Sequence, residues 1–324
     1  MPRLNMVQAL NLALDQEMAR DDSVVLLGED VGVDGGVFRV TDGLIAKYGA
    51  ERVMDTPLAE SGIFGTALGM AAAGLRPVAE MQFCGFSYLI VPQLQGHASR
   101  LRQRSLGQWS VPLVVRMPYG GGVRALEHHS ESPEATYAHF PGTKVVIPSS
   151  PRNARALLLA AIRDPDPVVF MEPKRSYRAF REEVPEDEEV LEIGRAQIAQ
   201  PGKDLTVVAW GAMMPFALKA VREVQGARGV TIEVIDLLTI SPMDSDTIIG
   251  SVKATGRCVV VQEAVKSFSV ASEIVARIND QALLHLEAPV KRVTGYDLVT
   301  PYFGREPGYI PSPGRIRRAI EQTL

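Results

Sequence analysis

Short apolar runs rich in valine alternate with segments of helical periodicity along most of this 324-residue chain. In the first half, such runs lie at residues 24–27, 77–83, 111–116, 144–147 and 168–171. Runs that are apolar throughout and separated by helices are typical of parallel strands covered by helices on both faces. The first half is therefore predicted to form a doubly wound α/β domain.

A second, smaller α/β domain is predicted in the other half of the chain, where the alternation resumes at residues 205–210, 232–237, 259–261 and 290–293. The acidic stretch 181–189 between the halves is nearly devoid of apolar residues and is expected to be a solvated connection. The predicted fold class is thus α/β with two doubly wound domains, at residues 1–185 and 190–324.

The bulk composition limits the possible partners of the chain. A hydrophobic content of 46% can fill two cores, and a net charge of −4 provides no basic field to hold nucleic acid or an anionic membrane. The N-terminus lacks a hydrophobic signal core, and no apolar run approaches the roughly 20 residues of a membrane span. A cytoplasmic protein is expected, with Cys84 and Cys258 as buried free thiols.

One acidic residue stands at the start of an unusual helical run. Glu60 precedes an apolar segment that contains Gly62, Gly65 and Gly69. A carboxylate at a helix N-terminus is ordinarily a cap or a dipole partner. Each glycine, however, costs about 1 kcal/mol in a helix interior, so three of them indicate that a backbone or ligand approaches this helix closely. Glu60 is therefore expected to lie at an interface.

A glycine-rich turn leads into the densest cluster of titratable groups. Residues 120–122 are all glycine and are predicted to form a flexible turn, and the segment 127–134 that follows contains His128 and His129. Adjacent side chains on an extended segment face opposite ways, so only one histidine is expected to face a pocket. Most loop histidines are structural, but this segment follows a parallel strand, where open α/β sheets bind ligands. A histidine there can move protons near neutral pH.

A strand near residue 80 is followed by an amide and two aromatic residues, Gln82, Phe83 and Phe86. Phenylalanines are core residues by default, but an aromatic face beside a glutamine can also hold a flat, hydrogen-bonding heterocycle. The sequence contains no dinucleotide fingerprint, Walker lysine loop, zinc-protease motif or nucleophile elbow. Nucleotide or zinc chemistry carried by this chain alone is not expected.

Several motifs together resemble one family over essentially the whole chain. They are Gly-Glu-Asp-Val-Gly at 28–32, Gly-Gly-Val-Phe-Arg at 35–39, Asp-Thr-Pro-Leu-Ala-Glu at 55–60, Glu-His-His-Ser at 127–130, Lys-Val-Val-Ile-Pro at 144–148, Asp-Pro-Asp-Pro at 164–167 and Gly-Ser-Val-Lys-Ala-Thr-Gly-Arg at 250–257. In order and spacing they resemble the beta subunit of the decarboxylating component of 2-oxo acid dehydrogenase complexes. The resemblance implies a transketolase-like fold, with a pyrimidine-binding domain followed by a transketolase C-terminal domain.

The resemblance implies thiamin diphosphate as a cofactor shared with an alpha subunit. The acid aligned with Glu60 bonds the aminopyrimidine ring nitrogen and activates the cofactor. The catalytic histidine of the family precedes the serine of its motif and maps to His129, with a role in proton transfer and in acyl transfer to lipoamide. The implied cofactor-binding residues are Glu29, Leu58, Glu60, Gln82 and Phe86. Phe86 stands where some members have tyrosine, which keeps an aromatic face but removes a hydroxyl group.

The resemblance also implies metal ions and partner chains. A structural potassium site maps onto Leu113, Ala161, Ile162, Asp164 and Asp166, with Asp166 in place of a frequent asparagine. From the residues alone, the two aspartates are ordinary turn residues. Family members bind Mg²⁺ through a Gly-Asp-Gly motif in the alpha chain, and this sequence has none. The chain is therefore expected to be inactive alone, to form an alpha2-beta2 heterotetramer and to serve a lipoyl-bearing dihydrolipoyl acyltransferase.

The substrate is less constrained than the reaction. Residues 55–62 and 82–86 resemble pyruvate-type subunits, whereas residues 132–134 and 172–174 resemble branched-chain types, and acetoin-cleaving relatives use nearly the same beta chain. Pyruvate is preferred. A non-catalytic scaffold subunit, in which Glu60 is only a helix cap, is an alternative of another class. The retained Glu60, His129 and Gln82 argue against it.

Overall fold

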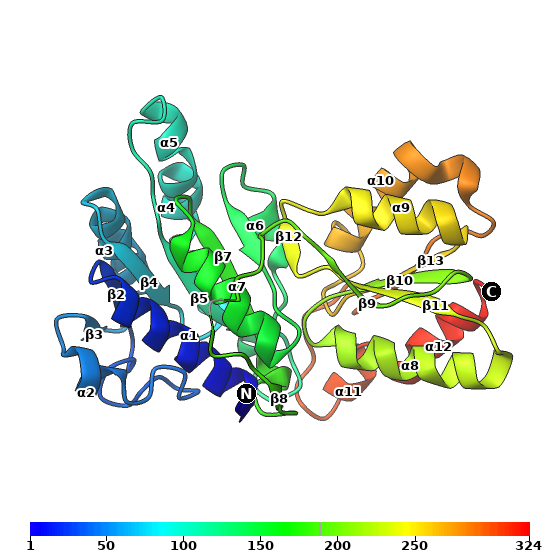
Figure 1. Cartoon of the computed structure of the whole chain (residues 1–324), viewed down its shortest axis with the longest axis horizontal. Helices are drawn as coiled ribbons and strands as arrows, with labels where there is room; N and C mark the ends of the chain where they lie inside the picture. Colours follow the sequence, from blue (N-terminus) through cyan, green and yellow to red (C-terminus); the bar gives the residue numbers. More distant parts are fainter. Residues whose placement is uncertain (188) are drawn as a thin grey trace. The chain divides into compact units, whose positions relative to one another are not determined.

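The computed structural model describes residues 1–187 and 189–324. The chain divides into two compact units, each built of strands and helices (Figure 1). Unit 1 comprises Met1–Tyr119 and Thr136–Ile193, and unit 2 comprises Gly120–Ala135 and Gly194–Leu324. The segment with the paired histidines therefore belongs to unit 2. No helix among the described residues has the length and apolar character needed to cross a membrane.

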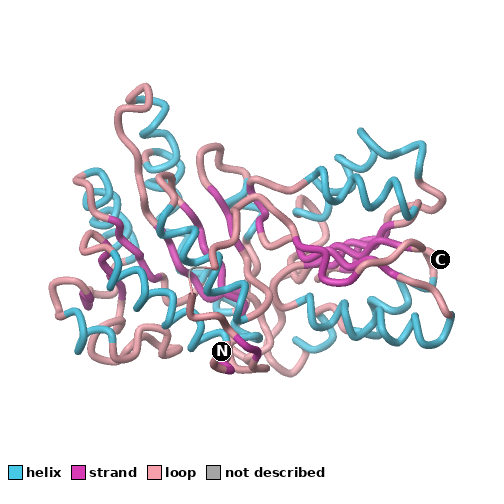
Figure 2. Tube along the Cα trace, viewed as in Figure 1, coloured by secondary structure: helices cyan, strands magenta, loops and turns pink. Residues whose placement is uncertain are grey.

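Unit 1 is built on parallel strands, as the continuous apolar runs predicted. These strands lie in the order β6-β7-β5-β4-β2-β3, and each neighbouring pair is parallel. Their carboxyl ends consequently meet at one edge of the sheet. Strands are drawn in magenta in Figure 2. The strands are β2 (Val24–Gly28), β3 (Val53–Asp55), β4 (Arg76–Glu80), β5 (Val114–Tyr119), β6 (Lys144–Val146) and β7 (Val168–Pro173).

The longer helices of the first part of the chain have clear start signals. Asn5 and Gln8 form a reciprocal capping box at the start of α1, while the Ser150 side chain caps α7, which has Pro151 as its first residue. These two helices pack against each other. The helices are α1 (Met6–Arg20), α2 (Leu44–Tyr48), α3 (Glu60–Ala72), α4 (Val91–Gly96), α5 (Leu101–Arg104), α6 (Glu134–Ala138) and α7 (Pro151–Arg163). Short 3-10 helices occupy Cys84–Ile90, Ala98–Arg100, Glu127–His129, Lys174–Ser176 and Leu283–His285.

The acidic stretch 181–189 belongs to unit 1. Arg181, Glu183, Glu186 and Asp187 are exposed, as predicted for a solvated segment, but the boundary between the units lies further along, at Ile193 and Gly194. Glu182–Glu183 forms β8, which pairs antiparallel with β1 (Arg3–Leu4). Val184 is fully buried, and Glu189 accepts a hydrogen bond from Arg152 at 2.5 Å. Backbone pairing with the N-terminus holds the segment in place despite its acidic composition. Residue 188 lies outside the described residues.

Unit 2 has a smaller sheet with the strand order β14-β13-β10-β11-β9. Its parallel strands match the apolar runs of the sequence, whereas the antiparallel edge strand β9 was not predicted, because it is polar and partly exposed. The helices α8 and α12 lie against one face and α9 and α10 against the other (Figure 1). The elements are β9 (Gln197–Gln200), β10 (Leu205–Ala209), α8 (Met213–Arg228), β11 (Ile232–Asp236), β12 (Thr239–Ser241), α9 (Ser245–Thr255), β13 (Cys258–Val261), α10 (Val270–Ala282), β14 (Lys291–Val293), α11 (Glu306–Tyr309) and α12 (Pro313–Glu321).

Both cysteines are buried free thiols, as predicted. Cys84 lies in unit 1 and Cys258 in unit 2. Burial raises the pKa of the Cys258 thiol to about 12, so this group stays protonated at neutral pH and behaves as a small apolar side chain.

A buried ion cluster ties three neighbouring strands together at their carboxyl ends. Arg116 on β5 donates to Glu80 on β4 at 2.7 Å and to both oxygens of Glu172 on β7 at 2.6 and 2.8 Å. Tyr177 donates its hydroxyl to Glu172 at 2.5 Å. Burial alone would lower the pKa of Arg116, but the two carboxylates raise it above its usual value. The guanidinium is therefore permanently charged and satisfied on both sides.

Replacing Arg116 with methionine should destabilise the protein strongly. The substitution leaves two buried carboxylates without their cation, which costs on the order of 3–5 kcal/mol. Arg152→Met is a matched control, because the Arg152–Glu189 pair is half exposed and worth less than about 1 kcal/mol. Urea unfolding of the purified proteins measures both changes. Equal midpoints for the two variants would contradict the assigned role of the cluster.

Candidate active site

Glu60 is the first residue of α3, and its side chain is buried, with the residue only 4% exposed. The cap position is occupied by Ala59, and no side-chain hydrogen bond caps the helix. Within the described residues, no hydrogen bond joins the Glu60 carboxylate to another side chain or to a backbone amide. The carboxylate therefore does not act as a local cap. It is a buried acceptor placed in the favourable field of a helix N-terminus.

A second acid lies close to Glu60. Glu29 follows β2 and is 7% exposed. Its pKa is raised first by burial and then by the negative charges of Glu60 and Asp30. Asp30 in turn accepts a hydrogen bond from Gln82 at 3.3 Å. Because β2 and β4 are adjacent parallel strands, the residues that follow them meet at one edge of the sheet.

Aromatic rings accompany these polar groups. Phe86, in the 3-10 helix Cys84–Ile90, packs edge-on against Phe83 with ring centroids 5.8 Å apart. Phe38 contacts the same Phe83 ring at 5.5 Å, and the Lys174 ammonium lies 5.5 Å from its centroid. Leu58, two residues before α3, is 80% exposed. Leu58 therefore provides exposed apolar surface two residues from the buried Glu60.

The ion cluster of Glu80, Arg116 and Glu172 was missed from the sequence, although its signal was present. Each of these charged residues interrupts or ends an otherwise apolar strand, where burial requires a partner. Gly36 lies directly above the cluster. A Cβ atom built on Gly36 would stand 3.4 Å from a Glu80 oxygen, and its backbone has a φ of +78°. The loop that contains Glu29 and Asp30 therefore reaches the ion cluster at Gly36, next to Glu80.

The three helix glycines have different surroundings. At Gly65, a Cβ atom would meet the Gln93 side chain at 2.9 Å, so the close approach predicted from the glycines occurs there within the chain. Gln93 also donates to the Ser61 carbonyl at 3.0 Å. Nothing in the described chain lies within 4 Å of a Cβ at Gly69. The interface predicted at this helix stays a prediction for that position.

The paired histidines lie on the 3-10 helix Glu127–His129 in unit 2. His128 is exposed and His129 is half-buried, so the two side chains differ in environment, as predicted for neighbours. The Ser130 hydroxyl donates to the Leu126 carbonyl at 3.0 Å and closes this turn. Of the two, His129 is the one held in the protein surface.

The glycine turn is held in place, and its prediction as flexible is wrong. The Gly121 amide donates to Glu263 at 2.5 Å, and the Gly122 amide donates to Glu306. Both carboxylates are buried, with 4% and 3% of these residues exposed. Since these amides already bind carboxylates of the same unit, they are not available as a phosphate cradle.

Glu134 is a buried acid just beyond the histidines. It is 1% exposed, and the Trp210 indole donates to it at 3.4 Å. Burial, with a contribution from the Glu263 charge, raises the pKa of Glu134 to about 8. Glu134 is thus mostly protonated at neutral pH.

The positions implied for a potassium ion already have protein partners. Lys144 bonds the Asp164 carboxylate at 2.8 and 2.5 Å, and Arg102 bonds Asp166 at 2.5 Å. Arg76 donates to the carbonyl oxygens of Ile162 at 2.9 Å and Asp164 at 3.3 Å. Each carbonyl oxygen retains a second lone pair, so the set can still ligate an ion. Potassium stays a prediction.

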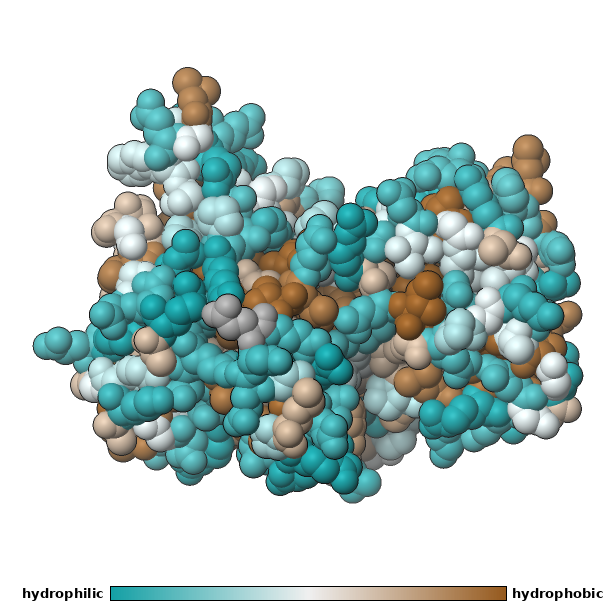
Figure 3. Space-filling model, viewed as in Figure 1, coloured by the Kyte–Doolittle hydropathy of each residue, from teal (hydrophilic) through white to brown (hydrophobic). Residues whose placement is uncertain are grey.

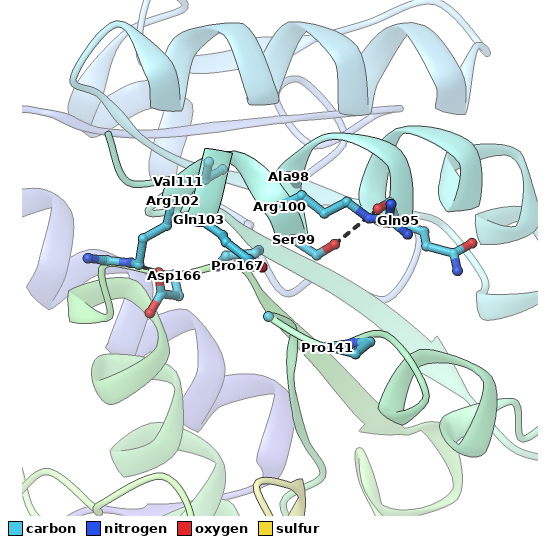
Figure 4. Close-up of a pocket in the computed structure, with 11 residues that line it drawn as sticks. Gln95, Ala98, Ser99, Arg100, Arg102, Gln103, Val111, Pro141, Asp166 and Pro167 are labelled. Atoms are coloured by element: carbon cyan, nitrogen blue, oxygen red, sulfur yellow. Dashed lines mark hydrogen bonds and ion pairs between the residues drawn. The ribbon is translucent and has the colours of Figure 1, made fainter. Parts of the chain in front are cut away.

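Asp166 also borders a surface cavity of about 410 Å³ in unit 1. Figure 4 shows Arg102 next to Asp166 at one end of the cavity, with Ser99 and Gln95 joined by a hydrogen bond further along. No group of three or more His, Cys, Asp or Glu side chains suited to a metal ion occurs in residues 1–187 and 189–324. An ion here would depend on backbone carbonyls.

Comparisons with known proteins identify the family. The family models for the transketolase pyrimidine-binding domain and the transketolase C-terminal domain match residues 3–180 and 194–316. The beta subunit of the pyruvate dehydrogenase E1 component from Acholeplasma laidlawii is 51% identical over 319 residues, which cover 98% of this chain and 97% of that one. Its counterpart from Bacillus subtilis is 50% identical over 324 residues, covering 100% and 99%.

The chain belongs to the family of pyruvate dehydrogenase E1 beta subunits.

The transketolase-like fold of this family is confirmed by a solved structure as well. A split-gene transketolase, described as an inactive beta4 tetramer, has a TM-score of 0.80 and covers 100% of this chain and 99% of its own. At 22% identity, that likeness concerns the fold alone. Of the predicted site residues in this family member, the structure brings Glu29 close to Glu60 and ties Gln82 to Asp30.

Glu134→Gln should remove a pH-dependent loss of stability. Between its ordinary pKa of 4.5 and its folded pKa of about 8, the unfolded chain is ionised at Glu134 while the folded chain keeps the proton. Stability therefore falls as pH rises through this window, by up to about 1.4 kcal/mol per pH unit. Glutamine cannot ionise, so the melting temperature of the variant relative to wild type should increase from about pH 5.5 to pH 8.

The matched control for this measurement is Glu273→Gln, which changes an exposed glutamate in the same unit. Its melting temperature relative to wild type should not vary with pH over the window. A difference between Glu134→Gln and wild type that is constant with pH would contradict the protonated state of Glu134.

Proposed function

We propose that this chain is the beta subunit of a pyruvate dehydrogenase E1 component and that it forms the pyrimidine side of a thiamin diphosphate site. The observation that carries the proposal is the buried Glu60 carboxylate, which no other described residue satisfies by a hydrogen bond. Relatives at 46–51% identity over nearly their full length bear the name of this subunit, which supports pyruvate as the substrate.

The residues around Glu60 fit an aminopyrimidine ring. A flat heterocycle with ring nitrogens and an amino group needs a carboxylate acceptor, further polar groups and aromatic or apolar surface. Glu60, Gln82 and Phe86 supply these three kinds of contact, and the exposed Leu58 adds apolar surface. When bound, thiamin diphosphate supplies a nucleophilic carbon and an electron sink for decarboxylation of a 2-oxo acid.

In the proposed site, a carboxylate oxygen of Glu60 would form a hydrogen bond with a ring nitrogen of the cofactor. The backbone amides at the start of α3 would favour a negatively polarised acceptor at this position. Glu29 binds a proton more readily than an exposed glutamate does, because its pKa is raised.

His129 is proposed to act in the later half of the reaction. An imidazole can give and take a proton near neutral pH, which suits transfer of an acyl group to the thiol of a lipoyl group. The half-buried side chain on a closed turn has fewer orientations available than that of His128. Its partner in this step would be a lipoyl-bearing dihydrolipoyl acyltransferase.

An alpha subunit is proposed to complete the active site. The sequence has no Gly-Asp-Gly motif, so Mg²⁺ and the diphosphate group would be held by the partner chain in an alpha2-beta2 heterotetramer. The face drawn in Figure 3 is mostly hydrophilic, with scattered hydrophobic patches. Large apolar residues with highly exposed side chains include Leu58, Phe268 and Leu284, which are 80–99% exposed. A potassium ion at the end of α7 would be a further, structural component.

Glu60→Gln should abolish most decarboxylation without preventing assembly. In the complex reconstituted with the cognate alpha subunit, we expect the pyruvate decarboxylation rate to fall by about 100-fold or more, because glutamine cannot exchange a proton with the ring. Cofactor binding, measured by calorimetry, should weaken far less. Glu51→Gln, which alters an exposed glutamate of unit 1, serves as the matched control. An unchanged rate in Glu60→Gln would refute the activating role.

His129→Ala should separate the two halves of the reaction. Reductive acylation of a lipoyl domain should drop by about 100-fold, whereas decarboxylation measured with ferricyanide as oxidant should change much less. The neighbouring exposed residue supplies the control, since His128→Ala should leave both rates near those of the wild type. Equal effects of His129→Ala and His128→Ala on the two rates would contradict the catalytic role of His129 and indicate a structural one.

A further inference from the structure

Two buried glutamates of unit 2 accept hydrogen bonds from the backbone at the start of the segment that leads to His128 and His129. Glu263 follows β13 and accepts the Gly121 amide at 2.5 Å, while Glu306 opens α11 and accepts the Gly122 amide. Hydrogen bonds from amides to ionised carboxylates are stronger than those between neutral groups. Two separate elements thus fix consecutive peptide units of one turn.

The glycines at this turn allow the close approach of the carboxylates. A Cβ atom at Gly121 would clash with a Glu306 oxygen and would displace that carboxyl group from its present position. Gly120 has a φ of +78°, and its Cβ atom would lie 3.0 Å from Glu263. The glycine run therefore serves close contact and a left-handed backbone, and free motion is not needed to explain it.

The far end of the segment is also fixed within unit 2. The Gly120 amide donates to the Glu131 carbonyl at 2.8 Å, which joins the two ends of the loop. Beyond it, Glu134 is buried and bonded to Trp210 at 3.4 Å. The turn Glu127–His129 lies between these two anchored ends. Its position consequently depends on contacts made several residues away.

We propose that Glu263 and Glu306 are positioning residues, which hold the loop of residues 120–131 so that His129 is oriented for acyl transfer. The proposal rests on the proposed function of His129 and extends it to two residues that neither touch the substrate nor exchange protons with it. Their effect is expected on the histidine-dependent step.

The test uses the reconstituted alpha–beta complex with four variants: Glu263→Gln, Glu263→Ala, Glu306→Gln and the surface control Glu273→Gln. Hydrogen exchange followed by mass spectrometry measures how well ordered the loop is. Amide exchange at residues 121–130 should be faster in the first three variants than in wild type. Glutamine keeps an acceptor oxygen and alanine does not. Glu263→Gln should therefore keep the loop more ordered and the complex more active than Glu263→Ala does. The glutamine variant is also the one expected to fold more readily.

Kinetics then show whether the contacts position the histidine. We expect Glu263→Ala to lower the rate of lipoyl acylation by at least about tenfold. The rate of pyruvate decarboxylation in the ferricyanide assay, and the KM for pyruvate in that assay, should change by less than about twofold. The two glutamine variants should show a smaller loss confined to the same step. The Glu273→Gln complex should match wild type in both assays and in hydrogen exchange.

Two results would overturn the proposal. The first is unchanged hydrogen exchange at residues 121–130 in all three loop variants, which would show that the contacts do not order the loop. The second is faster exchange with either unchanged acylation or equal losses in both half-reactions, which would indicate a structural role alone. Failure of the wild-type complex to decarboxylate pyruvate would instead refute the proposed function, while hydrogen exchange would still decide whether the glutamates hold the loop.

Discussion

The Arg116 guanidinium, buried between Glu80 and Glu172, is the contact on which the arrangement of unit 1 depends. Parallel strands bring their carboxyl ends to one edge of the sheet. Packing of the apolar strand faces alone does not determine the positions of the residues at that edge. The ion cluster joins three adjacent strands at that edge, and it tolerates no slip in register, because a shifted strand would leave a buried charge unpaired. The residues that follow these strands, including Gln82 after β4, are thereby placed with little freedom.

The two units treat buried carboxylates in different ways, and the difference matches their proposed roles. Unit 1 neutralises Glu80 and Glu172 with a guanidinium, which builds a rigid base, and leaves Glu60 as a buried acceptor without a partner among the described residues. In unit 2, Glu263 and Glu306 accept backbone amides of the glycine turn, while Glu134 keeps its proton. One arrangement leaves a carboxylate without a hydrogen-bond partner among the described residues, and the other uses carboxylates to hold a loop.

The sequence predicted much of the fold, because apolar runs and helix start signals are local and periodic. The parallel strands of unit 1 other than the short β3, most strands of unit 2 and the helix begun at Glu60 followed from these patterns. The edge strand β9 and the pairing of β1 with β8 did not, since exposed polar strands have no periodic signal. The glycine turn was misjudged for a related reason: glycine permits both mobility and close contact, and the deciding partners, Glu263 and Glu306, lie more than a hundred residues away. Charged residues within apolar strands could have revealed the Arg116 cluster.

We propose that this chain contributes half of an active site, in which Glu60 faces a cofactor whose site a partner chain completes. The most direct measurement is turnover with thiamin diphosphate, Mg²⁺ and an artificial oxidant, for the chain alone and with its alpha subunit, on pyruvate, a branched-chain 2-oxo acid and acetoin. We predict no turnover by the chain alone, and turnover by the complex with the highest kcat/KM on pyruvate. Turnover by the chain alone, or none by the assembled complex on any of these substrates, would contradict the account.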